Sequence, residues 1–125
     1  MHTFAHVFSV ELGERFITGR EERWNKGRLV HKSASFLHYD PRTDKFRLKE
    51  IYSYGFVNNE VEYARTDKEI RFEVVIEPSL KRFEGMRWRS YMRKISEAKI
   101  AMGLERAERK EEFERFGETI AEREP

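Results

Sequence analysis

The chain contains no cysteine and no long hydrophobic run. The first absence excludes a disulfide framework, a thiolate nucleophile and a zinc site built from cysteine. The second excludes a membrane-spanning helix, which needs about 18 consecutive apolar residues. The first residues, MHTFAHVFSVELGER, also lack the basic start and continuous apolar centre of a signal peptide. We therefore expect a soluble, cytoplasmic protein with no membrane partner.

The composition that is present indicates a folded domain. Aromatic residues make up 14% of the chain, too many for a disordered polyelectrolyte even though 38% of the residues are charged. A length of 125 residues suits one continuous core but not two domains of ordinary size. We expect residues 1–125 to form a single domain.

The net charge of +2 conceals two segments of opposite sign. Between residues 80 and 94 six basic residues stand against one acidic residue, whereas from Glu105 to Glu124 eight glutamates stand against five basic residues. A basic strand beside an acidic strand explains this pattern. A nucleic-acid-binding protein normally carries a strong basic excess, so no nucleic-acid partner is expected.

The stretch from Phe36 to Tyr54 has the pattern of a β-hairpin. Two runs rich in aromatic and aliphatic residues flank Asp40-Pro41-Arg42-Thr43-Asp44. Pro41 fixes φ for the first central position of a turn, and Asp40 can bond back to the turn backbone. The second run alternates with a period of two, which predicts one buried face carrying Phe46, Leu48, Tyr52 and Tyr54.

Eight or nine short extended runs, separated by turn residues every ~8–12 positions, are typical of an all-β barrel or sandwich. In this pattern the run from Glu14 to Thr18 is expected to end at Gly19. The polar segment from Glu21 to Gly27 is expected to be a connection or a lid. A further strand is defined by the apolar residues Val57, Val61 and Tyr63.

The segment from Glu105 to Phe116 is ambiguous. It is rich in Glu, Arg and Lys, and apolar residues from Phe113 onward are spaced three and four apart, so local propensity favours a short helix near the C-terminus. A barrel, however, closes only if its last strands return to pair with the first. We therefore expect strands over Ser96–Arg106 and Glu112–Glu122.

Three segments, FLHYDPRTDKFRLKEIYSYGFVNNE, RWRSYMRK and FGETIAERE, together resemble the lipocalin-like β-barrels of the calycin superfamily. The nearest likeness is to small uncharacterised prokaryotic domains of that kind, and it covers roughly residues 12 to 123. The resemblance implies a single antiparallel up-and-down barrel of eight to ten strands. The interior of such a barrel can hold one apolar ligand.

The bulk of the interior side chains decides whether such a barrel is hollow or filled. Large aromatic and flexible groups can line a pocket or fill it. The candidate ligand-binding residues are Phe8, Phe46, Tyr52, Tyr54, Phe72, Trp88, Arg89, Tyr91 and Met92.

Arg89 and Tyr91 are candidates for a carboxylate clamp, because fatty-acid-binding members of the superfamily use an Arg-x-Tyr pair on a late strand. A guanidinium and a phenol two residues apart share one strand face and can bind a carboxylate together. Strand parity opposes this assignment. If Arg89 and Tyr91 point inward, the apolar Trp88 and Met92 must point outward.

Other chemistry has little support in the sequence. The haem-binding relatives use a histidine on a strand near the C-terminus, and none follows His38, so no haem, metal or other cofactor is expected. Glu50, on the same face as Tyr52, is the best candidate for an inward general base, and His6 could supply a proton. No glycine-rich phosphate loop or serine nucleophile elbow is present.

Three functions remain open at this point. The favoured one is non-enzymatic binding of a small apolar ligand, with or without an acidic head group, for which a cavity containing Tyr52, Phe72 and Trp88 would argue. The second is a filled barrel that serves as an interaction or oligomerisation module, including a homodimer. The third is a small lyase or isomerase, which requires Glu50 or His6 to line a pocket beside a tyrosine.

Overall fold

A computed structural model describes residues 2–11, 16–53, 55, 57–75, 86–108 and 112–124. No helix among these residues is long and apolar enough to cross a membrane. The described residues form the strands β1 (His2–Glu11), β2 (Phe16–Asn25), β3 (Arg28–Asp40), β4 (Lys45–Tyr52), β5 (Val57–Arg65), β6 (Glu69–Val75), β7 (Met86–Ser96), β8 (Lys99–Glu108) and β9 (Glu114–Arg123).

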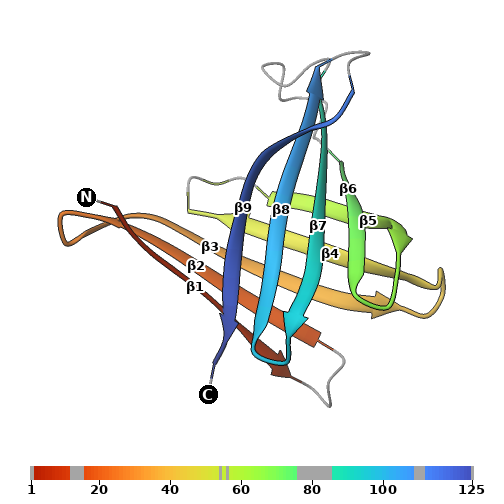
Figure 1. The fold of residues 1–125 in the computed structure, drawn as a ribbon, viewed down its shortest axis with the longest axis horizontal. Helices are drawn as coiled ribbons and strands as arrows, with labels where there is room; N and C mark the ends of the chain where they lie inside the picture. The colour runs from red at the N-terminus through yellow and green to blue at the C-terminus, as the bar shows by residue number, and fades with distance from the viewer. Residues whose placement is uncertain are drawn as a thin grey trace.

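The nine strands close into a barrel in the order of the sequence, so the predicted all-β barrel is confirmed (Figure 1). Each strand from β1 to β8 pairs antiparallel with the next. Because the chain reverses direction at every turn, the first and ninth strands of such a series run the same way. The closing pair β1–β9 is therefore parallel. The expectation of a wholly antiparallel barrel is wrong at this pair.

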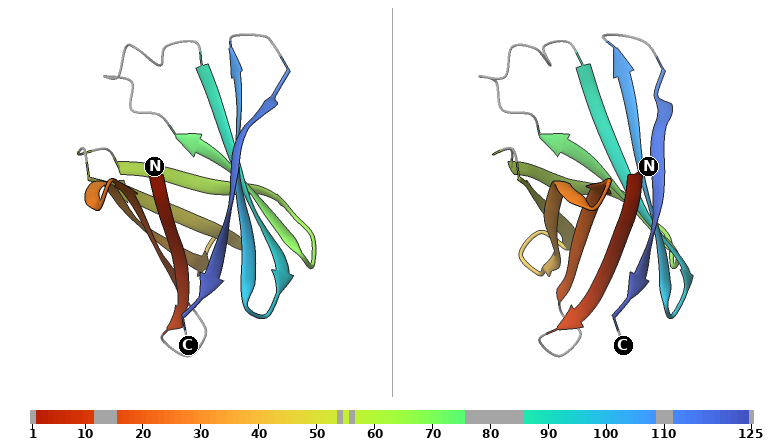
Figure 2. Two further views of the ribbon diagram at one scale, coloured as in Figure 1. Left: turned by 60° about the vertical axis from the view of Figure 1, so that its left-hand side comes forward. Right: turned by 90° about the vertical axis from the view of Figure 1, so that its left-hand side faces the viewer.

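The closure between β1 and β9 is short. It consists of the register pairs Val7 with Glu122 and Phe8 with Arg123, followed by a hydrogen bond from the Glu124 amide to the Phe8 carbonyl at 2.8 Å. The end of β9 accordingly lies beside the end of β1, whereas the start of β1 lies far from the start of β9 (Figures 1 and 2). The two ends of the barrel are therefore built differently.

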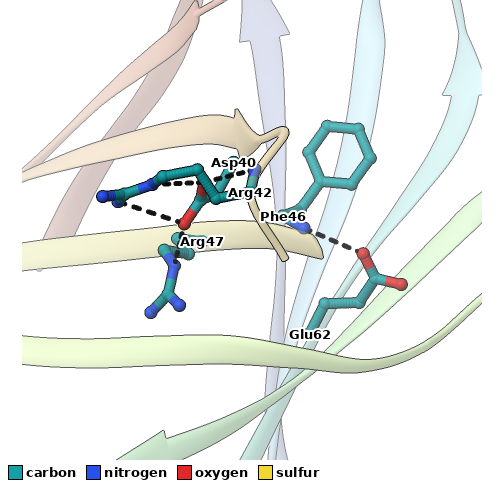
Figure 3. A network of polar contacts seen from close by, with 5 residues as sticks. All are labelled: Asp40, Arg42, Phe46, Arg47 and Glu62. Atoms are coloured by element: carbon teal, nitrogen blue, oxygen red, sulfur yellow. Dashed lines mark hydrogen bonds and ion pairs between the residues drawn. The ribbon is translucent and has the colours of Figure 1, made fainter. Parts of the chain in front are cut away.

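The β3–β4 hairpin forms at the predicted turn, and Asp40 organises it (Figure 3). The Asp40 carboxylate accepts hydrogen bonds from the backbone amide of Arg42 at 3.0 Å and from Arg47 Nε at 3.1 Å. The Arg42 guanidinium also donates to this carboxylate and, with its backbone amide, lowers the pKa of Asp40 to about 2. A buried aspartate is satisfied here because three donors converge on it.

A second carboxylate, that of Glu62 on β5, binds the backbone of this hairpin. The register of β5 shifts between Glu62 and Ala64, and the Phe46 amide donates to the Glu62 carboxylate at 2.9 Å (Figure 3). The side chain of Glu62 thus takes the place of a backbone acceptor beside the irregular part of β5. A backbone amide left without a partner there would cost free energy.

The second strand does not end at Gly19, contrary to expectation. β2 continues to Asn25, and Trp24 belongs to the strand, not to a connection or lid. The turn that follows is only Lys26-Gly27, with φ of 52° and 76°. Two successive positive φ values are typical of the tight hairpin turn that matches strand twist. Gly19 lies against Ser35 of β3, whose hydroxyl would have to move to admit a Cβ at this position.

In the C-terminal segment the structure confirms the two expected strands, which are β8 and β9. The described residues of this segment contain no helix. β8 and β9 pair along most of their length, with a register shift between Leu104 and Glu105. Local propensity favoured a helix, but backbone pairing with β8 and closure against β1 prevail over it. The register shift accounts for the loss of a clean strand alternation in the sequence.

The outer face of β7–β9 is organised by Tyr91. Its ring lies against Gly103 of β8, where a Cβ would overlap the ring atoms, and its hydroxyl donates to Glu118 of β9. The guanidinium groups of Arg71 and Arg93 lie 5.4 Å and 5.8 Å from the ring centroid. Tyr91 is only 4% exposed although it is on the outside of the barrel.

This packing predicts that Gly103→Ala destabilises the protein by about 1–3 kcal/mol, because the new methyl group displaces the Tyr91 ring. Gly117→Ala is the matched control, since a Cβ at Gly117 meets nothing within 4 Å. The control should be neutral or slightly stabilising. Urea unfolding of the two variants measures the difference, and equal stabilities would contradict the proposed packing.

Candidate functional site

The middle of the barrel is filled by four side chains, and we call them the plug. Leu37, Leu48, Phe72 and Met92 come from β3, β4, β6 and β7 and pack together. Phe72 has no exposed surface. Cavities lie on both sides of the plug, and Met92 borders each of them. The interior is therefore neither hollow throughout nor solid.

The cavity near the β5–β6 and β7–β8 turns has a volume of about 360 Å³, and we call it the apolar chamber. Its walls are Phe8, Val10, Ile17, Leu37, Phe46, Ile70, Met92 and Ile100. The polar residues that border it belong to the two turns and to the end of β9. The chamber thus combines an apolar interior with a polar mouth.

Four cationic side chains border the mouth of the apolar chamber, and two of them have carboxylate partners. Arg65 pairs with Asp44 at 3.1 Å, and Lys94 pairs with Glu97 at 2.5 Å. Within the described part of the chain, Lys68 and Arg123 form no ion pair. These two cations are available to an acidic group that enters the mouth.

The cavity on the other side of the plug has a volume of about 320 Å³, and we call it the acidic chamber. It lies where β1 and β9 have diverged, between β2–β4 and β7–β9. Its apolar border consists of Ala34, Leu48, Met92, Met102, Leu104 and Phe116. Its polar border consists of Glu21, Arg23, Ser33, Ser35, Glu50, Tyr52, Ser90, Tyr91, Glu118 and Thr119.

Glu50 and Tyr52 act as a pair in the acidic chamber. Both lie on the inner face of β4, and the Tyr52 hydroxyl donates to the Glu50 carboxyl. Burial raises the pKa of Glu50, while the hydrogen bond from Tyr52 lowers it and the charge of Glu21 raises it. The net shift is upward. A carboxyl of this kind can hold or release a proton closer to neutral pH than a surface glutamate can.

Glu60 lies on the neighbouring strand β5, in register with Leu48, and does not itself line the acidic chamber. Its side chain is 2% exposed, and its Oε1 accepts a hydrogen bond from the Ser90 hydroxyl at 2.5 Å. No described residue donates to its Oε2. Burial, and next the charge of Glu50, raise the pKa of Glu60 well above its usual value, although the bond from Ser90 lowers it. Glu50 and Glu60 thus lie on adjacent strands, and the charge of Glu50 disfavours ionisation of Glu60.

The structure distributes the predicted ligand-binding residues over several places. Phe8 and Phe46 line the apolar chamber, and Met92 borders both chambers. Tyr52 lines the acidic chamber. Phe72 belongs to the plug, and Trp88 packs edge-to-face on Phe116 with 5.4 Å between ring centroids. Tyr54 is outside the described residues.

The structure places Arg89 and Tyr91 on the outer face of β7. Met92 belongs to the plug, so its neighbour Tyr91 and, two residues earlier, Arg89 lie on the outer face. Tyr91 also borders the acidic chamber, but its hydroxyl is bound to Glu118. The Arg89 guanidinium stacks 4.1 Å from the ring centroid of Phe113 and 4.7 Å from that of Tyr63. The Arg-x-Tyr pair therefore offers no interior carboxylate clamp.

The structure describes the two catalytic candidates, Glu50 and His6, to different extents. Glu50 lines a cavity beside a tyrosine, as acid–base chemistry would require. The backbone of His6 pairs with Glu21 of β2, but its side chain is outside the described part of the structure. The described residues contain no group of three or more His, Asp or Glu side chains that could hold a metal ion.

Sequence reasoning missed Glu60. The apolar residues Val57, Val61 and Tyr63 suggested the buried face of β5, yet Val57 and Tyr63 are each 40% exposed. Glu60 pairs in register with Leu48 of the plug, which places the glutamate inside. The inward position of Glu60 follows only from the pairing of β5 with β4. The apolar residues of β5 alone predict that the opposite face is buried.

No family model, curated protein or solved structure matches this chain. The functional argument therefore rests on the geometry of the two chambers.

The raised pKa values predict that the free energy of unfolding falls as the pH rises. A carboxyl with a higher pKa in the folded than in the unfolded chain is stabilising when protonated, and this advantage is lost above the unfolded value of 4.5. We expect the stability from these carboxyls to be lost progressively as the pH rises from 4.5 through their raised pKa values. Glu60→Gln, which stays neutral, should show a smaller fall.

Urea unfolding at several pH values measures this effect. Glu73→Gln serves as the control, because Glu73 is exposed on the outer face of β6. The control should follow the pH dependence of the unmodified protein. An identical pH dependence for Glu60→Gln would show that Glu60 is ionised in the folded state at little cost.

Proposed function

We propose that the protein is a non-enzymatic barrel that binds one small apolar molecule with an acidic head group in the apolar chamber. The observation that supports this function is an apolar cavity of about 360 Å³ with Lys68 and Arg123 at its mouth. Small-molecule sites are typically concave, mostly apolar and supplied with a few polar groups that orient the ligand.

The charges at the mouth favour an acidic head group over a neutral one. Arg65 and Lys94 are already neutralised by carboxylates, whereas Lys68 and Arg123 form no ion pair with any described residue. A ligand carboxylate would supply the missing counter-charge through charge-assisted hydrogen bonds. The tail would lie against Phe8, and its burial contributes about 0.8 kcal/mol per methylene group.

We also propose that the chain is related to the lipocalin-like barrels of the calycin superfamily, as small prokaryotic domains of that kind. The sequential strand order and the apolar chamber support this relationship. The parallel β1–β9 pair and the plug across the interior are departures from a simple antiparallel cup. A likeness in fold would not by itself assign a ligand.

A small lyase or isomerase is the second candidate function, and Glu50 beside Tyr52 in the acidic chamber supports it. A carboxyl with a raised pKa is suited to general acid–base catalysis. Such a reaction also needs a group that stabilises developing negative charge. The guanidinium that borders this chamber, Arg23, is 3.3 Å from the Glu21 carboxylate, which reduces its effect as an electrophile. Binding is therefore the better-supported function.

Replacement of the two mouth cations tests the proposed function. Lys68→Gln and Arg123→Gln should each weaken octanoate binding roughly tenfold, because each variant removes one charge-assisted hydrogen bond. The affinity for 1-octanol should change much less. Isothermal titration calorimetry measures both ligands, and Lys49→Gln, at an exposed position of β4, is the control.

Equal losses for octanoate and 1-octanol would contradict a role for these cations in binding the head group. Failure of the unmodified protein to bind octanoate would contradict the proposed function itself.

A further inference from the structure

The plug separates the two chambers unevenly. On the side of β3 and β4 the partition has two side chains, because Leu37 borders only the apolar chamber and its register partner Leu48 borders only the acidic chamber. On the side of β7 a single side chain, that of Met92, borders both chambers, and no other described residue does so. The partition is therefore only one side chain thick at Met92.

The neighbours of Met92 hold its side chain in the partition. Met92 is 8% exposed and packs with the other three members of the plug. Its register partners on the adjacent strands, Ile70 of β6 and Met102 of β8, also pack against the plug. An unbranched thioether side chain is flexible when it is free, but close packing in a protein interior confines side chains to few rotamers. Met92 thus closes the passage between the chambers.

The apolar chamber has too little room for a long tail. Its volume of about 360 Å³ is near the lower end of the range of about 300–1,000 Å³ found for small-molecule sites. A water molecule takes about 30 Å³ in the liquid, and a methylene group is of comparable size, so the chamber holds about a dozen such groups. The tail of octanoate fits within this space, whereas the tail of hexadecanoate does not.

We propose that Met92 sets the longest tail that the apolar chamber accepts, a role that rests on the proposed binding of an acidic amphiphile there. The head group at the mouth, beside Lys68 and Arg123, fixes one end of the ligand. Lys94 borders the mouth, and Met92 lies two residues earlier on the same inner face of β7, so the tail runs inward from the mouth to Met92. The ligand class is thus a fatty acid of medium chain length.

The space behind Met92 suits an apolar tail once this side chain is removed. Leu48, Met102 and Leu104 border the acidic chamber, which has a volume of about 320 Å³. Replacement of Met92 by alanine removes the side chain that borders both chambers and joins them into one cavity. A longer tail then extends past β7 into the second chamber, while the head-group site at the mouth is unaltered.

Equilibrium dialysis of the full chain against radiolabelled octanoate, decanoate, dodecanoate and hexadecanoate tests this role of Met92. From octanoate to decanoate the affinity should rise by about fourfold for each added methylene group, because each one is buried. The additional carbon atoms of hexadecanoate have no room inside the unmodified protein. Its affinity for hexadecanoate should therefore not exceed its affinity for decanoate.

The ratio of hexadecanoate affinity to octanoate affinity is the quantity to compare among variants, since a general loss of affinity cancels in it. Met92→Ala should raise this ratio at least roughly tenfold, because the longer tail is now buried. Met102→Ala is the matched control: it makes the same change at the register partner of Met92, which borders the acidic chamber alone. Met92→Leu conserves volume and keeps the partition. Both controls should retain the ratio of the unmodified protein.

Two results would overturn the role of Met92. One is an affinity of the unmodified protein that keeps rising by about fourfold per methylene group from decanoate to hexadecanoate, a measurement that does not require any variant to fold. The other is an equal ratio for Met92→Ala and Met102→Ala. Both results would leave octanoate binding intact. Failure of the unmodified protein to bind octanoate would instead contradict the proposed function, and the role of Met92 with it.

Discussion

The contact of Leu37, Leu48, Phe72 and Met92 across the barrel holds the β3–β4 wall against the β6–β7 wall. Closure of the strands alone could not do this, because β1 and β9 share only two register pairs. The plug therefore supplies the cohesion of the interior, at about 1.5–3 kcal/mol for each fully buried large apolar side chain. It also determines that the interior consists of two separate chambers.

The odd number of strands makes the closing pair parallel, and this pair joins β1 and β9 at one end of the barrel only. β1 and β9 run parallel and meet near the C-terminus, so one end is closed around an apolar cavity with cations at its mouth. At the other end they diverge, and this is where Glu50 lines a polar cavity with Glu60 behind it. The two cavities thus differ in the charged groups at their borders.

The sequence predicted those parts of the fold in which local pattern and register agree. The turn at Asp40 and the inward face of Phe46, Leu48 and Glu50 were readable, because turn chemistry and alternation coincide there. The direction of the closing pair could have been deduced only from the exact strand count. The inward position of Glu60 could not be predicted, because the apolar residues of β5 indicate the other face and pairing with β4 prevails.

Nuclear Overhauser spectroscopy on protein with labelled leucine and methionine methyl groups tests the divided interior most directly. The structure predicts cross-peaks that link the methyl groups of Leu37, Leu48 and Met92 with the ring of Phe72. These residues come from four strands, so the cross-peaks arise only if the plug spans the barrel. Their absence in a folded protein would show one continuous cavity and contradict the two-chamber account.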